Sequence, residues 1–157
     1  MRNPLILFSL CLLCLVLTLP ANAGDWSRFR GDIGNGTSDS VNLPTEFGPE
    51  KNVAWAAEIP FGRSSPVIAK DRIFISATDE GNFVTMALDR QSGKTLWSAS
   101  LEPSRKDEFH HDTDSATTTP VTDGKNVYVF FQEVGLVSYD AHGKERWRHN
   151  RPLKASK

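Results

Sequence analysis

The chain has 157 residues, with 18 Lys and Arg against 19 Asp and Glu, and its formal net charge is −1 with both signs dispersed. Because it has no basic patch, the composition argues against nucleic acid as a partner. Its two cysteines, Cys11 and Cys14, both lie in an apolar N-terminal segment, so the rest of the chain cannot form disulfides.

Residues 1–23 have the pattern of a secretory signal peptide. Arg2 provides a positive start, an apolar run follows from Leu5 to Leu19, and Ala21-Asn22-Ala23 is a small-x-small cleavage site. The apolar run is shorter than the roughly 20 residues of a membrane-spanning helix, which disfavours an uncleaved membrane anchor. We therefore expect a protein that is exported to the periplasm or secreted.

Residues 24–52 are rich in Gly, Asn, Ser, Asp and Pro, with widely spaced apolar side chains such as Trp26 and Phe47. This composition predicts an irregular N-terminal arm. From Val53 onward, short β-prone runs alternate with turn signals, and no long apolar period of 3.6 residues indicates a helix. We expect strands at residues 53–59, 65–69, 72–77, 83–88 and 95–99, and a second set at residues 118–122, 126–131, 136–139 and 145–149.

The two sets of expected strands repeat one another in sequence. SSPVIAKDRIFIS (residues 64–76) aligns with TTPVTDGKNVYVF (residues 118–130), and the apolar run in each is continuous, so both faces of that strand need cover. A repeated four-stranded unit of this length is typical of a β-propeller. We predict an all-β propeller over residues 53–157, with four-stranded antiparallel blades at about 64–100 and 116–150, and with Trp55 on the last strand of an earlier blade. A β-sandwich is the alternative, but it leaves the repetition unexplained.

Each unit contains an Asp-turn-Gly-Trp phrase, ALDRQSGKTLW (residues 87–97) and SYDAHGKERW (residues 138–147). An Asp side chain can accept hydrogen bonds from the turn amides, and Gly can adopt the positive φ of a tight reversal. The pair would set the hairpin register and direct the tryptophan toward the neighbouring blade. A ligand-stacking platform is the alternative role for the tryptophans. We predict a structural docking motif made of Asp89, Gly93, Trp97, Asp140, Gly143 and Trp147.

The first phrase resembles the tryptophan-docking motif of the pyrroloquinoline-quinone-like (PQQ-like) β-propeller repeat proteins at every named position, Ala-x-Asp-x-x-x-Gly-x-x-x-Trp. The second is similar, with Ser in place of Ala and a shorter turn. DWSRFRGDIGNG (residues 25–36) also resembles the arm that precedes the first blade in exported proteins of this type. The resemblance implies either a non-enzymatic scaffold or a quinone-dependent dehydrogenase.

The resemblance includes quinone-dependent dehydrogenases, in which a quinone and a calcium ion lie on the propeller axis. There the calcium is held by Glu, Asn and Asp, beside a catalytic Asp and often a vicinal disulfide. Residues 24–157 contain no cysteine, and no matching ligand set can be placed. We therefore assign no catalytic, cofactor-binding or metal-binding residue, and expect PQQ and calcium only if the chain is the N-terminal part of such a dehydrogenase. Enzymatic activity stays open on this basis.

A cluster at His110, His111, Asp112 and Asp114 is a weaker candidate for zinc, copper or calcium binding. Neighbouring side chains on an extended strand point to opposite faces, which favours a solvated loop between the blades. The hydroxyl residues before Pro66 and Pro120 are expected to begin equivalent strands and to serve no nucleophilic role.

Propellers of this kind need roughly six to eight blades to close. Two blades and a strand therefore suggest a truncated product, or copies that associate to complete a ring. We expect an exported scaffold that binds a protein or a polysaccharide through its blade loops. The alternative is the N-terminal fragment of a quinone-dependent dehydrogenase.

Overall fold

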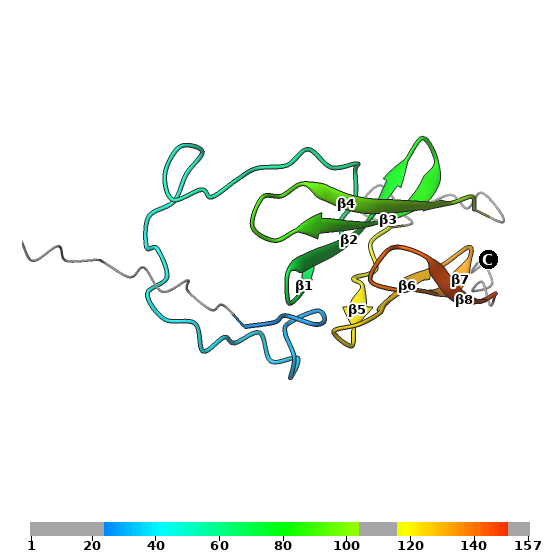
Figure 1. Ribbon diagram of the computed structural model, residues 1–157, viewed down its shortest axis with the longest axis horizontal. Helices are drawn as coiled ribbons and strands as arrows, with labels where there is room; N and C mark the ends of the chain where they lie inside the picture. Colours follow the sequence, from blue (N-terminus) through cyan, green and yellow to red (C-terminus); the bar gives the residue numbers. More distant parts are fainter. Residues whose placement is uncertain (1–23, 104–115, 151–157) are drawn as a thin grey trace, which may run out of the picture.

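The computed structural model describes residues 24–103 and 116–150. Over these ranges the fold is all-β, without a helix, and consists of two four-stranded antiparallel sheets (Figure 1). This architecture confirms the predicted fold class, and each sheet is one propeller blade. In the same ranges there is no helix with the length and apolar character needed to cross a membrane.

Blade 1 contains the strands in chain order, joined by tight reversals. Its two central strands pair from Arg72↔Asp89 at one end to Asp79↔Asn82 at the other. One row across the sheet aligns Phe74, Ala87 and Trp97. The strands are β1 (Val67–Ala69), β2 (Arg72–Asp79), β3 (Asn82–Asp89) and β4 (Thr95–Leu101).

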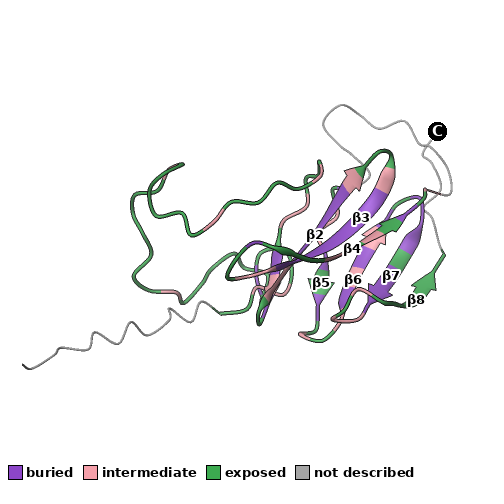
Figure 2. Cartoon of the chain, turned by 45° about the horizontal axis from the view of Figure 1, so that its top comes forward, coloured by how far each residue is buried: buried purple, intermediate pink, exposed green. Residues whose placement is uncertain are grey.

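Blade 2 repeats this arrangement with shorter strands. The row equivalent to the one above aligns Tyr128, Ser138 and Trp147. Its outer strand is exposed at every position, which Figure 2 shows as the green arrow of β8. The strands are β5 (Val121–Thr122), β6 (Val127–Phe131), β7 (Gly135–Tyr139) and β8 (Glu145–His149).

The main core lies between the two blades. Phe83 of β3 stacks on Phe131 of β6, with ring centroids 4.6 Å apart and planes 17° apart. Val129 and Val137 of blade 2 are buried in the same cluster as Phe74 of blade 1. Because successive strand residues point to opposite faces, a second cluster forms on the other face of blade 1. Both faces of blade 1 are thus covered, as the continuous apolar runs predicted.

The strand expected at residues 53–59 does not form. These residues are extended but pair with no neighbouring strand, and the first ladder contact after them is an isolated bridge between Phe61 and Thr78. A strand is defined by hydrogen bonds to a partner, so β-prone composition alone does not make one. The prediction of an additional strand there was wrong, although Trp55 of this segment occupies a defined site described below.

The N-terminal arm contacts the first strand of each blade. Trp26 exchanges both backbone hydrogen bonds with Ile68 of β1, each 2.8 Å long. One residue later, the carbonyl of Ser27 accepts a 2.9 Å bond from the amide of Thr122 in β5. In Figure 1 the blue arm accordingly passes beside β1 and β5. The arm therefore connects the two blades at their inner edges and satisfies backbone groups there.

Candidate functional site

The hairpin between β3 and β4 is held by Asp89. Its Oδ1 accepts hydrogen bonds from the backbone amide and the hydroxyl of Ser92, at 2.7 and 2.6 Å. Its backbone amide donates to the carbonyl of Lys94 at 2.8 Å, and Gly93 adopts φ +71°. The Ser92 hydroxyl and amide bonds hold the pKa of the Asp89 carboxyl below its usual value, because they stabilise the charged form.

The hairpin between β7 and β8 uses the same chemistry with a shorter turn. Oδ1 of Asp140 accepts bonds from the amides of His142 and Lys144, at 2.8 and 3.0 Å. The Asp140 amide donates to the carbonyl of Lys144 at 2.9 Å, and Gly143 has φ +81°. Those amide bonds also lower the pKa of Asp140. In both hairpins the aspartate is therefore committed to the turn.

Each hairpin contains a register shift just before its tryptophan. Opposite Trp97 is Ala87, but the next pair is Leu88↔Thr95, so Leu96 is left over on β4. Blade 2 has the same irregularity between Ser138 and Tyr139. A bulge of this kind bends the strand and redirects its side chains. This shift cannot be predicted from the sequence alone, since no residue type marks the extra position on the outer strand.

Trp97 reaches the hairpin of the following blade. Its indole Nε1 donates a 3.0 Å hydrogen bond to the carbonyl of Ala141, the residue after Asp140. Its ring lies flat on Gly143, where an added Cβ would be 2.6 Å from Cδ2 of the indole. The ring also contacts Tyr139, with centroids 5.9 Å apart. A glycine is therefore required here both for its positive φ and for the space above it.

Trp55 makes the equivalent hydrogen bond and glycine contact on blade 1. Its Nε1 donates a 3.0 Å bond to the carbonyl of Arg90, the residue after Asp89. A Cβ on Gly93 would overlap the six-membered ring of Trp55. The indole of residue 55 thus occupies the blade 1 hairpin as that of Trp97 occupies the blade 2 hairpin, even though its segment is not a strand.

Trp147 has no equivalent partner in the part of the chain that the structure describes. It packs beside Tyr128, with ring centroids 6.0 Å apart, and is 38% exposed. Trp147 was expected to contact a neighbouring blade, and among the described residues it has no such contact.

Comparison with known protein families agrees with this geometry. Residues 49–156 match the protein-family model described as outer membrane protein assembly factor BamB, a model of PQQ-like repeats. The chain belongs to this PQQ-like repeat family. A search of curated proteins found no match.

In this PQQ-like protein, the hydroxyl residues that precede Pro66 and Pro120 form hydrogen bonds with backbone groups. The hydroxyl of Ser64 donates to the carbonyl of Ser76 at 2.8 Å and accepts from its amide at 3.0 Å. The equivalent Thr118 hydroxyl donates to the carbonyl of Phe130. Ser76 in turn donates a 2.6 Å bond to the carbonyl of Thr118, which joins the blades. These contacts give the hydroxyls a structural role.

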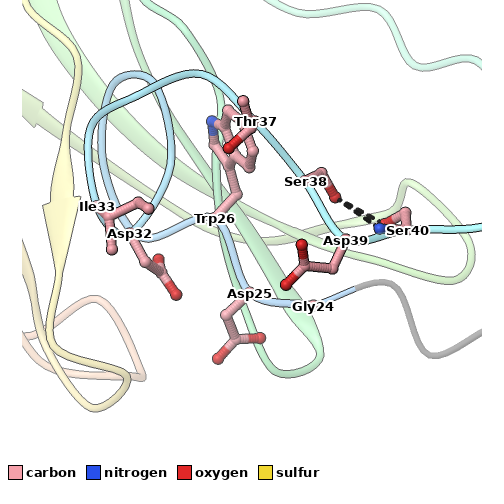
Figure 3. A pocket seen from close by; sticks show the side chains of 9 residues that line it. All are labelled: Gly24, Asp25, Trp26, Asp32, Ile33, Thr37, Ser38, Asp39 and Ser40. Atoms are coloured by element: carbon pink, nitrogen blue, oxygen red, sulfur yellow. Dashed lines mark hydrogen bonds between the residues drawn. The ribbon is translucent and has the colours of Figure 1, made fainter.

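An open pocket of about 410 Å³ lies against the N-terminal arm (Figure 3). Three aspartates line it, but two of them accept backbone hydrogen bonds: Asp25 from the Lys70 amide and Asp32 from the Ser27 amide, each at 2.8 Å. The hydroxyl and amide of Ser27 hold the pKa of Asp32 below its usual value. Asp39 adds a third carboxylate at the rim, beside the hydroxyls of Ser38 and Ser40.

No cluster of three or more metal-ligating side chains exists within residues 24–103 and 116–150. The weaker metal candidate, comprising His110, His111, Asp112 and Asp114, lies outside the described residues. The arm pocket and the contact of the arm with both blades were missed by the sequence analysis. The signal in the sequence was the pair Trp26 and Gly31. In the described residues a tryptophan lies over a glycine in three places, and this pair is one of them.

Proposed function

We propose that this PQQ-like protein is an exported propeller scaffold that binds another protein through the loops at one end of its blades. The observation that carries the proposal is that the polar atoms of the repeated motif are used by the fold itself. Asp89 and Asp140 hold turns, and the Trp97 indole bonds a backbone carbonyl. The side chains that the sequence repeats therefore support structure and binding surface better than catalysis.

The arm and the Asp-Gly turns share one end of the blades. Because the strands are antiparallel, the β1–β2 and β3–β4 turns lie together, and the amide of Arg90 donates to the carbonyl of Asp71 at 2.9 Å. Asp25 ties the arm to the same end through the Lys70 amide. Exposed charges of both signs gather there, including Lys94, together with the pocket of Figure 3. A polar, mixed-charge surface of this kind suits a protein partner.

The family description supports the choice of partner, since it names an outer membrane protein assembly factor. The signal-peptide pattern of residues 1–23 supports export. Together they favour a scaffold outside the cytoplasm over a quinone-dependent dehydrogenase.

Site-specific photocross-linking in the native host tests this proposal. A benzophenone amino acid replaces Asp39 at the pocket rim, and a matched variant replaces Asp79, which is exposed at the opposite end of β2. We expect one defined protein adduct from position 39 and none from position 79, with the protein in the exported fraction.

Three results would count against the scaffold. The first is a polysaccharide adduct at position 39, which would change the class of partner. The second is equal labelling from both positions, which would show that binding is not confined to the loops at one end of the blades. The third is dye reduction by the purified protein with PQQ and calcium, which would favour the dehydrogenase.

A further inference from the structure

The face of blade 2 that points away from blade 1 is apolar and exposed. Val121 is 42% exposed, Leu136 37% and Trp147 38%. Tyr128 and Phe130 lie on the same face and are half-buried. We call these five residues the donor face. Tyr128 is fixed there because its hydroxyl donates a 2.8 Å bond to Asp123.

The donor face is the structural equivalent of the face through which blade 1 packs on blade 2. Phe74 and Trp97 share a row in blade 1, with ring centroids 6.0 Å apart and planes at 45°. Tyr128 and Trp147 share the matching row in blade 2, with centroids 6.0 Å apart and planes at 38°. The first pair contacts a neighbouring blade, so the second is built for the same kind of contact.

The surface that would receive the donor face also exists in this chain. In blade 2, the pairs Val127↔Tyr139 and Val129↔Val137 receive blade 1 beside the Gly143 turn. The matching pairs of blade 1 form the second apolar cluster, beside the Gly93 turn. We call this cluster the acceptor face, and its members are Ile73, Ile75, Val84, Met86 and Leu88.

Residues 53–62, which we call the cap, contact blade 1 at both ends of the acceptor face. At one end of the sheet, Trp55 lies on Gly93 and bonds the Arg90 carbonyl. At the other end, Phe61 bridges Thr78, and the backbone of Gly62 lies against Ser76 and Ala77. Apart from the Phe61 bridge, the cap forms no ladder with a strand, whereas the blade 2 equivalent is covered by a whole sheet.

We propose that the cap keeps the acceptor face closed to the donor face of a second copy, and that displacement of Trp55 lets copies join head to tail, with Trp147 of one copy on Gly93 of the next. Both tryptophans present the same indole ring and N–H group, and the Gly93 turn with the Arg90 carbonyl accommodates one of them at a time. The second copy is the occupant because its Trp147 would lie over Gly93 with its N–H at the Arg90 carbonyl, as Trp97 lies over Gly143 with its N–H at the Ala141 carbonyl.

Analytical ultracentrifugation of the purified mature chain tests the proposal. The wild type has an open donor face and a closed acceptor face, and sediments as a monomer. Trp55→Ala opens the acceptor face and gives oligomers whose mass rises with concentration, with an apparent dissociation constant at least about tenfold lower than that of the wild type. Trp55→Ala combined with Trp147→Ala returns to a monomer.

Mixing separates the two halves of the junction. The double variant has an acceptor face only, so with wild type it forms a complex that stops at two chains. With the single variant Trp147→Ala it forms none. A complex in the second mixture, or none in the first, overturns the proposal.

Gly93→Ala is the matched control for exposed apolar surface. It also displaces Trp55, but its methyl group blocks the site for Trp147 as well. It should therefore release the cap and stay monomeric, and association equal to that of Trp55→Ala would show non-specific aggregation and overturn the proposal.

Trp55→Phe guards against loss of folding in the alanine variant. It keeps an aromatic ring but covers less area than indole and loses the N–H bond to Arg90, so it should associate more than the wild type and less than Trp55→Ala. A folded Trp55→Phe that sediments like the wild type overturns the proposal. Since only purified chain is present, this outcome is independent of any loop-binding partner.

Discussion

Trp97 and Trp147 occupy equivalent positions in the two blades but have different surroundings. Trp97 lies over a glycine of the next hairpin and bonds a carbonyl there, whereas Trp147 is partly open to solvent. The environment, and not the residue type, should therefore decide how much each contributes to stability.

We predict that Trp97→Ala lowers the free energy of unfolding by about 3 kcal/mol, because it removes a large packed ring. Trp147→Ala should cost less than about 1 kcal/mol, as an exposed substitution does. Urea unfolding followed by far-UV circular dichroism measures both. Equal losses would mean that the contact with Gly143 does not stabilise the protein.

Gly143 can be compared with Gly124, which has nearly the same φ. Both residues have positive φ, +81° and +82°, so an alanine at either suffers backbone strain of roughly 1–2 kcal/mol. Only at Gly143 does the added Cβ meet the Trp97 ring, while nothing lies within 4 Å at Gly124. We predict a larger loss of unfolding free energy for Gly143→Ala, together with a change in tryptophan fluorescence that Gly124→Ala lacks. Matching losses in the two variants would leave strain as the sole effect.

At the scale of elements, the apolar runs located the repeat and the eight strands of the two blades. A strand was predicted at residues 72–77 because continuous apolar residues need cover on both faces. The strand forms there as β2 and continues to Asp79. Residues 53–59 share that composition but have no partner strand, and pairing is invisible in a single segment. Likewise, aligning the two copies of the motif shows what repeats, but not that Trp97 reaches the hairpin of the following blade while Trp147 has no such partner among the described residues.

The N-terminal arm is the element whose role was least predictable, since its contacts are made by backbone groups. Trp26 is positioned over Gly31, where an added Cβ would lie 2.9 Å from its ring, at φ +80°. The same arm pairs with Ile68 and receives a hydrogen bond from the amide of Thr122.

We predict that Gly31→Ala displaces Trp26 and loosens the arm, so that the amides of Ile68 and Thr122 exchange with solvent at least about tenfold faster. Gly34→Ala is the matched control, because it has φ +71° but open space around it. Hydrogen exchange followed by nuclear magnetic resonance measures both amides. Unchanged protection in Gly31→Ala would show that Trp26 does not hold the arm.

For the whole molecule, a buried tyrosine at the junction between the blades should make the folded state less stable at high pH. Tyr139 is 2% exposed between the blades, and burial raises its pKa to about 12, with the charge of Glu145 adding to the effect. In the unfolded chain a tyrosine titrates near pH 10. The unfolded state therefore loses this proton first, and the stabilising contribution is complete below pH 10 and is lost as the pH rises toward 12.

We predict that the unfolding free energy of the wild type falls between pH 10 and 12, and that Tyr139→Phe is less sensitive over this interval. Tyr128→Phe removes a tyrosine from the exposed face and should still show most of the loss. Urea unfolding at a series of pH values measures the three proteins. Parallel curves for wild type and Tyr139→Phe would locate the alkaline sensitivity elsewhere.

The two hairpins differ in length only ahead of their glycines. One has Asp89 and Gly93, the other Asp140 and Gly143, yet in both the aspartate amide bonds the carbonyl of the lysine that follows the glycine. A codon gained or lost between Asp and Gly during gene duplication thus alters only the outer bend of the loop. Lengths can drift there over evolutionary time, while a codon gained between Gly and Trp would misplace the indole and be removed by selection.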